Sequence, residues 1–117
     1  MSKDNKIIPF PERGRNEALR RIRMAAENSW DRLDLSNLGL DSLPRELEML
    51  KGLQHLLLGS NKPVLVEGKY TYVLPTFTDI SPVAALTDLR FIDLSGATRL
   101  QDLSPLSSLV KLHELSA

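Results

Sequence analysis

The side chains best suited to acid–base chemistry in this chain are two histidines and a few scattered aspartates. His55 and His113 lie 58 residues apart, and the aspartates that could assist them are Asp31, Asp34, Asp41 and Asp93. A nucleophile–base–acid relay needs its groups within hydrogen-bond reach of one another. No His-x-x-x-His pair, paired carboxylates or glycine-rich phosphate loop occurs in the sequence. We therefore predict a protein that is not an enzyme, with no catalytic residues, metal ligands or cofactor.

A cluster of basic residues near the amino terminus is the other candidate for chemistry. Its members are Arg13, Arg15, Arg20, Arg21 and Arg23. One interpretation is contact with phosphate or an acidic partner. The other, which we favour, is a solvated helix face that Glu12, Glu17 and Glu27 partly balance, since no aromatic residues alternate with the arginines.

Composition narrows the class of partner and the compartment. The 117 residues carry 15 basic and 15 acidic side chains, so no overall field attracts nucleic acid or a membrane surface. Cysteine is absent, which excludes disulfides and thiolate metal sites. The amino terminus lacks the apolar run of a signal peptide, and no apolar stretch reaches 18 residues. From this we expect a cytoplasmic protein.

Leucines recur at a fixed period from residue 30 onward. The spacing of Leu89, Ile92 and Leu94 begins again at Leu112, 23 residues later. Earlier copies start at Leu53 and at Trp30. This period and the Leu-x-x-Leu-x-Leu spacing are typical of a leucine-rich repeat solenoid, and the 23 leucines of the chain fit a stacked aliphatic core.

The chain thus resembles the bacterial leucine-rich repeat family over about residues 30–115. Residues 30–47, with their Leu-Asp-Leu-Ser-Asn-Leu-Gly-Leu run, look like the first repeats of Roco-type multidomain proteins. The Ile-Ser-Pro-Val and Leu-Ser-Pro-Leu steps at residues 80–83 and 103–106 are similar to those of internalins. The resemblance implies an α/β leucine-rich repeat solenoid, with a short parallel sheet on the concave side and an N-terminal cap helix.

The expected elements position the candidate residues. Residues 1–13, with Pro9 and Pro11, suggest an extended or disordered lead, and residues 14–117 the repeat domain. A cap helix over 16–28 is predicted from the helical spacing of Leu19, Ile22, Ala25 and Ala26. We expect Trp30 to be the first core layer against this helix. Short turns of helix are predicted after Pro44 and at the two Ser-Pro steps.

Repeats beginning at residues 30, 53, 89 and 112 predict four parallel strands. Residues between the inward leucines then form two surface columns, because neighbours along a strand point to opposite faces. One column is Arg32, His55, Phe91 and Glu114, and the other is Asp34, Leu57, Asp93 and Ser116. The sequence predicts a partner-binding face about 15 Å across, with Leu57 and Phe91 as its apolar centre and the charged side chains as its rim. The alternative is that these two are ordinary exposed apolar residues.

The second repeat is too long. Leu53 to Leu89 spans 36 residues, 13 more than the period, and the excess falls at about residues 62–78. Two β-rich runs around Glu67-Gly68 predict a hairpin there. Tyr70 and Tyr72 share one side of it. These tyrosines either contact a partner or cover the apolar flank of the second coil, and the sequence does not decide between the two.

The fourth repeat stops one strand in, so we expect a longer chain, a second copy or a partner to cover Leu112 and Leu115. The sequence hypothesis is a non-catalytic protein-interaction module of a larger bacterial signalling or defence protein. Its partner is another protein or a further domain of the same protein. Alternatives are the regulatory N-terminal segment of a Roco-type GTPase and a structural unit that dimerises through its last edge.

Overall fold

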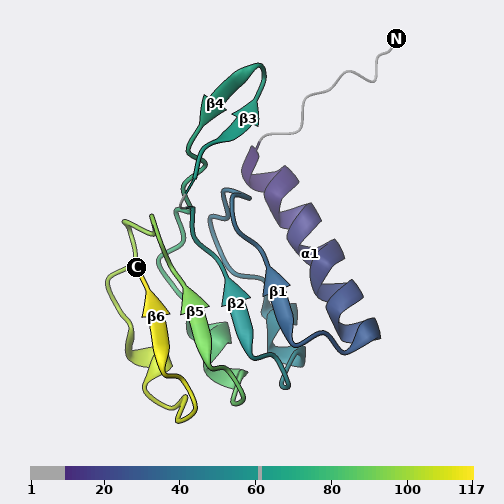
Figure 1. Ribbon diagram of the computed structural model, residues 1–117, viewed down its shortest axis with the longest axis vertical. Helices are drawn as coiled ribbons and strands as arrows, with labels where there is room; N and C mark the ends of the chain where they lie inside the picture. The colour runs from purple at the N-terminus through teal and green to yellow at the C-terminus, as the bar shows by residue number, and fades with distance from the viewer. Residues whose placement is uncertain (1–9, 61) are drawn as a thin grey trace.

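Four short parallel strands form one sheet along the length of the molecule. The computed structural model describes residues 10–60 and 62–117. The sheet has the order β1-β2-β5-β6, and each strand pairs with the next repeat along the chain (Figure 1). Its strands are Arg32–Asp34, His55–Leu57, Phe91–Asp93 and Glu114–Ser116. The predicted four-stranded parallel sheet is confirmed.

Short 3₁₀ helices carry the chain back between the strands. They are η2 (Arg45–Met49), η3 (Ser81–Ala85) and η4 (Ser104–Leu106), and they lie behind the sheet in Figure 1. Pro44 precedes η2, and a proline occupies the first turn of both η3 and η4. Proline fits a first helical turn because its missing N–H has no partner there in any case. The helical turns predicted at these three prolines are therefore confirmed.

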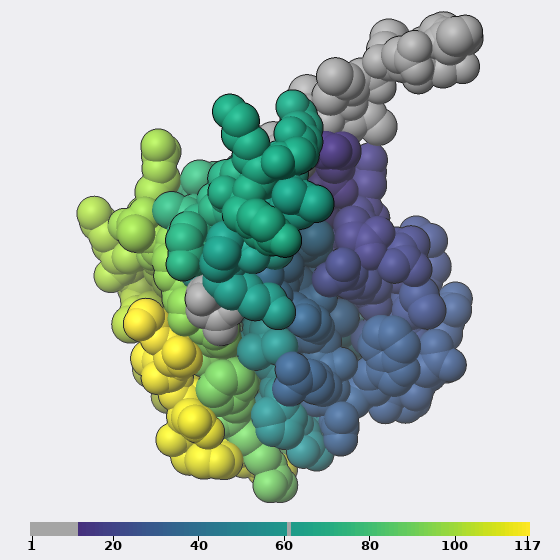
Figure 2. All heavy atoms as spheres, turned by 45° about the horizontal axis from the view of Figure 1, so that its top comes forward, coloured from purple at the N-terminus to yellow at the C-terminus, as the bar shows by residue number. Residues whose placement is uncertain are grey.

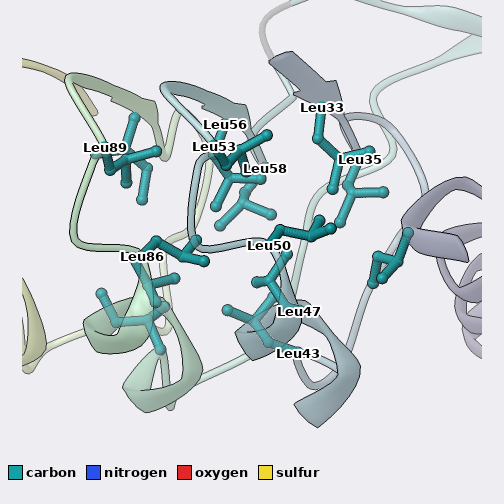
Figure 3. Close-up of a cluster of buried hydrophobic side chains, with 14 of the residues drawn as sticks. Leu33, Leu35, Leu43, Leu47, Leu50, Leu53, Leu56, Leu58, Leu86 and Leu89 are labelled. Carbon is teal, nitrogen blue, oxygen red and sulfur yellow. The ribbon is translucent and has the colours of Figure 1, made fainter. Parts of the chain in front are cut away.

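The core is a stack of leucine layers between the strands and the 3₁₀ helices. Leu33, Leu56 and Ile92 occupy equivalent register positions and are at most 1% exposed. Figure 3 shows the leucines of successive coils meeting inside the stack. Burying one such side chain contributes roughly 1.5–3 kcal/mol. Phe77, which we had counted within the insertion, is also fully buried and returns the chain to this core.

Repeated Asp-x-Ser steps set the turns around each coil. In every case the aspartate Oδ1 accepts a hydrogen bond of 2.8–2.9 Å from the backbone N–H two residues later. Such Asx turns let a short side chain replace a backbone partner. The turns at Asp34 and Asp93 follow strands. The turns at Asp79 and Asp102 precede 3₁₀ helices.

The helix α1 spans Phe10–Asn28 and lies against β1 and η2. It begins at Phe10 and not at Asn16, so the extended lead expected for residues 10–13 is wrong. Two prolines suggested a break, but Pro11 falls in the first turn, where its fixed φ fits a helix, and Glu12 there suits the helix dipole. The rest of the predicted lead, residues 1–9, lies outside the described residues.

The buried stripe of α1 consists of three small residues and one isoleucine. Gly14, Ala18, Ile22 and Ala25 face the first coil, whereas Leu19 is partly exposed and Ala26 exposed. A Cβ at Gly14 would lie 1.8 Å from the Leu38 carbonyl oxygen, so helix and coil approach closely. The predicted stripe was correct at Ile22 and Ala25 and wrong at Leu19 and Ala26, because the face that packs on the first coil runs through positions 14, 18, 22 and 25 and the other two positions lie beside it.

Trp30 is not the first core layer. Ser29 has a φ of 54°, and the Trp30 N–H donates to the Ala25 carbonyl oxygen at 3.0 Å, which ends the helix in a left-handed cap. Leu33 and Leu35 fill the first layer instead. Trp30 consequently stays 40% exposed beside the end of the helix.

Candidate interaction surface

The register of the sheet aligns the predicted surface columns residue by residue. Arg32 lies beside His55, His55 beside Phe91, and Phe91 beside Glu114. The two end residues are exposed, and the two central ones are partly buried. The ring centroids of His55 and Phe91 are 6.3 Å apart, within the range of favourable aromatic pairs. We call these two columns of side chains the open face.

One residue of the second column, Asp93, differs from the prediction. Leu57 is partly exposed as expected, and Asp34 and Ser116 are exposed. Asp93, however, is only 4% exposed, because its carboxylate turns back to accept from the N–H and Oγ of Ser95 at 2.9 and 2.5 Å. Asp93 therefore stabilises a turn and does not belong to a charged rim. Asp34 makes the equivalent bonds to Ser36 but remains open to solvent.

The insertion in the second repeat is a hairpin, as predicted. Strands β3 (Val64–Val66) and β4 (Lys69–Thr71) pair antiparallel. Glu67 and Gly68 between them have φ of 50° and 81°, and positive values at both central residues define the two-residue turn that matches strand twist. The hairpin projects beyond the carboxyl ends of the sheet strands (Figures 1 and 2).

The side chains on one side of this hairpin are apolar and open to solvent. Leu65 and Tyr70 stand opposite each other across the pair, and they are 62% and 77% exposed. Tyr72 is 58% exposed. The idea that the tyrosines cover the second coil is therefore wrong. In the described part of the chain the two strands contact no other helix or strand.

The open face and the hairpin are two surfaces joined by the second repeat. After β4 the chain passes Leu74, which lies so near Gly96 that a Cβ there would meet it at 3.0 Å. The Thr76 N–H then donates to the Leu40 carbonyl oxygen at 2.9 Å before Phe77 enters the core. These contacts anchor the base of the hairpin over the carboxyl edge of the sheet, and its tip is free of them.

The two histidines of the chain lie in different repeats. His55 lies in β2, while His113 precedes β6 and places its Nδ1 3.2 Å from the Lys111 carbonyl oxygen. Across residues 10–60 and 62–117, no three His, Asp or Glu side chains are grouped as they would be around a metal ion.

Several arginines of the basic cluster have structural partners. Glu17 accepts hydrogen bonds from Arg20 at 2.6 and 3.0 Å and from Arg21 at 2.8 Å, and these bonds lower its pKa to about 2. Arg21 also donates to the Asp34 carbonyl oxygen at 2.8 Å. Arg15 forms an ion pair of 2.8 Å with Asp41. Arg20 and Arg21 thus hold the middle of α1 together, and Arg15 and Arg21 fasten the helix to the first repeat.

Sequence reasoning missed one surface, the surroundings of Trp30. Pattern alone placed this large aromatic side chain inside, and only its exposed fraction and the hollows beside it show otherwise.

Among residues 10–60 and 62–117, the helices are too short or too polar to span a membrane.

No family model and no curated protein matches the chain. A leucine-rich repeat protein of Leptospira interrogans has a similar structure, with 31% identity, a TM-score of 0.55, and coverage of 80% of this chain and 21% of that one. Internalin C2 of Listeria monocytogenes is 18% identical over 84% of this chain and 52% of its own, with a TM-score of 0.44. Another Listeria monocytogenes internalin, InlF, is 21% identical over 92% and 45%, with a TM-score of 0.37.

The chain spans about a fifth of the length of the Leptospira protein. The name of the Leptospira protein says nothing of Roco-type proteins, so that narrower resemblance stays a prediction. The stacked repeats, the parallel sheet, the helix over its first coil and the likeness to the Leptospira protein agree: the chain is a leucine-rich repeat solenoid with a cap helix, and the leucine-rich repeat family is the one these findings support.

Proposed function

We propose that the chain is a non-catalytic protein-interaction module that binds its partner through the open face and the hairpin. Leucine-rich repeat folds are generally interaction modules, and stacked repeats present extended surfaces for binding. The observation that carries the proposal is the exposed apolar side of the hairpin. Leu65, Tyr70 and Tyr72 are all more than half exposed there, where a surface without a partner favours polar groups.

The open face has the layout of a small interface. Phe91 and Leu57 supply partly exposed apolar area near its middle, and the His55 ring packs beside Phe91. Arg32, Asp34 and Glu114 provide a charged rim at its two ends. Interfaces of proteins commonly combine such an apolar centre with a polar rim, and aromatic residues carry much of their binding energy.

Both surfaces lie on the same part of the solenoid. The hairpin stands at the carboxyl ends of the strands whose side chains form the open face (Figure 1). A partner seated on the open face can therefore reach the hairpin tyrosines without spanning the whole molecule. Because an isolated two-stranded hairpin is only marginally stable in water, contact with a partner also adds order to it.

Two double variants test the proposal and separate the surfaces. Tyr70→Ala with Tyr72→Ala removes the hairpin contact, and Leu57→Ala with Phe91→Ala removes the centre of the open face. The control is Leu103→Ala with Val110→Ala, which truncates exposed apolar residues of the last coil. Proteins captured from an extract of the source organism are identified, and the purified partner is titrated against each variant.

We expect each double variant to weaken binding by at least about tenfold, as loss of interface aromatic residues does. The control binds like the unchanged protein, and all three variants keep the circular dichroism spectrum. Unchanged affinity in both double variants would place the contact elsewhere and contradict the proposal.

We further propose that the module is part of a larger bacterial signalling or defence protein and acts in the cytoplasm. The support is that the similar Leptospira protein is several times longer than this chain. The coding sequence next to the module tests this idea. A downstream glycine-rich phosphate-binding loop would assign it to a Roco-type GTPase, and an open reading frame without further domains would contradict the larger protein.

A second candidate function is self-association through the last coil. Leu103, Leu115 and Val110 are 44%, 45% and 88% exposed on that coil. Two such surfaces can cover one another in a symmetric dimer. Sedimentation velocity over a wide concentration range decides: dimerisation lost on Leu115→Lys supports this function, and a strict monomer at every concentration excludes it.

A further inference from the structure

The exposed surface around Trp30 takes no part in the function proposed above. Two hollows lie against this side chain, on opposite flanks of α1. The hollow toward β1 has a volume of about 330 Å³ and is lined by Arg20, Met24 and Arg32 among others. The hollow toward η2 has a volume of about 230 Å³ and includes Met49 and Lys51. We call the two hollows and Trp30 the cap cleft.

The side chains of the cap cleft are those that bind proteins well. Tryptophan and arginine are the residues most enriched among interface positions that dominate binding, and methionine adapts to apolar partners. Trp30 is 40% exposed and Met49 57% exposed, so both apolar surfaces meet solvent. Nothing in the packing of the first repeat requires either exposure, since Leu33 and Leu50 are already buried beneath.

Charge indicates which partner fits. The residues lining the two hollows include four basic side chains, Arg20, Arg21, Arg32 and Lys51, and one acidic side chain, Asp34. The Asp34 carboxylate, which accepts from the N–H and Oγ of Ser36, keeps its negative charge, so the basic side chains of the lining outnumber it by three. The whole chain is neutral, so this excess of positive charge belongs to the cleft and not to the composition.

The carboxylate beside the cleft does not remove that excess. Glu17 binds both Arg20 and Arg21, so one negative charge is shared between two guanidinium groups. Arg32 and Lys51 add two further positive charges at the rims of the two hollows. Arginine groups in such a position pair with carboxylates in two-pronged hydrogen bonds.

We propose that the cap cleft binds an acidic peptide segment of a second protein, and that this segment carries one apolar anchor side chain. The anchor packs against the ring of Trp30, and carboxylates on either side of it meet Arg32 in one hollow and Lys51 in the other, since Arg20 already forms a two-pronged pair with Glu17. This site goes beyond the interaction proposed above, because it lies at the amino-terminal end of the solenoid. It shares Arg32 and Asp34 with the charged rim of the open face.

The only tryptophan of the chain makes the test direct. The unmodified 117-residue protein is titrated with the synthetic peptide Asp-Glu-Asp-Leu-Asp-Glu while the emission of Trp30 is recorded. A fluorescein-labelled form of the peptide gives the dissociation constant by anisotropy. We expect a saturable change in Trp30 emission, and an affinity that falls steeply with added salt because charged groups are paired.

Variants and control peptides decide where and why the peptide binds. Lys51→Glu weakens binding by about tenfold, and Trp30→Ala does the same or more, as truncation of an anchoring tryptophan does. The matched control Lys62→Glu makes the same charge change on an exposed residue past the carboxyl end of β2, and it should leave the affinity within about twofold. Circular dichroism confirms the fold of Trp30→Ala, and Lys51→Glu carries the test alone if that variant unfolds.

Three results would overturn the proposal. The first is no change in Trp30 emission with the acidic peptide. The second is equal affinity for a peptide with lysine in place of each acidic residue, or with serine in place of leucine. The third is tighter binding of a single-stranded oligonucleotide that is also lost in Lys51→Glu, since the cleft would then recognise phosphate and not a peptide.

Discussion

The two ends of the solenoid carry the same repeat in different surroundings. Leu33 in β1 and Leu115 in β6 hold the same register position, yet Leu33 is 1% exposed and Leu115 45% exposed. The helix α1 packs on the first coil, whereas among residues 10–60 and 62–117 no element pairs with the far side of β6. The comparison teaches that a repeat supplies its leucines, but its neighbour determines whether they stabilise the fold.

The largest difference between the ends is expected from leucine truncation. Leu33→Ala removes a fully packed side chain and leaves a cavity, so it should lower the free energy of unfolding by about 2–5 kcal/mol. Leu115→Ala removes a half-exposed one and should cost about 1 kcal/mol or less. Urea denaturation monitored by circular dichroism measures both. An equal loss of unfolding free energy in the two variants would show that the first and last coils are equally buried in solution.

The close contact of α1 with the first coil predicts the next effect. Gly14→Ala places a Cβ into the Leu38 carbonyl group and should destabilise the protein by about 1–3 kcal/mol, as overpacking does. Alanine otherwise favours a helix over glycine. The control is Gly52→Ala, where no atom lies within 4 Å of the new Cβ. A stabilised Gly14→Ala in thermal unfolding would mean that the helix does not sit against the coil.

The turns after β1 and β5 contain the same aspartate hydrogen bond in an exposed and in a buried position. Asp93→Ala leaves the Ser95 N–H in a poorly solvated place without its acceptor and should cost about 1–3 kcal/mol. Asp34→Ala breaks the same bonds at the exposed end of the sheet and should cost about 1 kcal/mol or less, because water replaces the carboxylate. The two costs are compared in the same denaturation experiment. A larger cost at Asp34 contradicts this account.

The smallest effect concerns the ion pairs within α1. Arg20 and Arg21 lower the pKa of Glu17 from 4.5 to about 2. Such a group stabilises the fold above its ordinary pKa and loses that contribution as the pH falls toward 2. Because these pairs are partly exposed, Glu17→Gln should cost only about 0.5–1 kcal/mol at pH 7. Thermal unfolding from pH 7 to pH 2 should show this difference shrinking below about pH 4.5, and a constant difference would refute the ionic cause.

Regular features of this molecule could be predicted from sequence, because each depends on local spacing. Leu33, Leu56 and Leu115 recur at a spacing that predicts the strands and their register. The Glu67-Gly68 pair predicts a two-residue turn. The open-face columns followed from the same register. Whether these columns and the hairpin bind a partner is a proposal that rests on exposure.

The features that escaped prediction depend on packing between distant segments. Gly14 gives no sign in the sequence that a carbonyl group lies against it. Trp30 looked like a core residue because large aromatic side chains usually are, and only the terminal turn of α1 leaves it outside. Asp93 and Asp34 occupy the same motif, but the neighbouring coil buries one of them and not the other. Each outcome is set by a neighbour that spacing along the chain does not identify.

Oxidative side-chain footprinting, with and without the captured partner, tests the central claim most directly. We expect binding to protect Tyr70, Tyr72 and Phe91 and to leave Leu103 and Val110 of the last coil as reactive as before. Protection confined to the last coil, with both tyrosines still fully reactive, would contradict the assignment of the open face and the hairpin as the interaction surface.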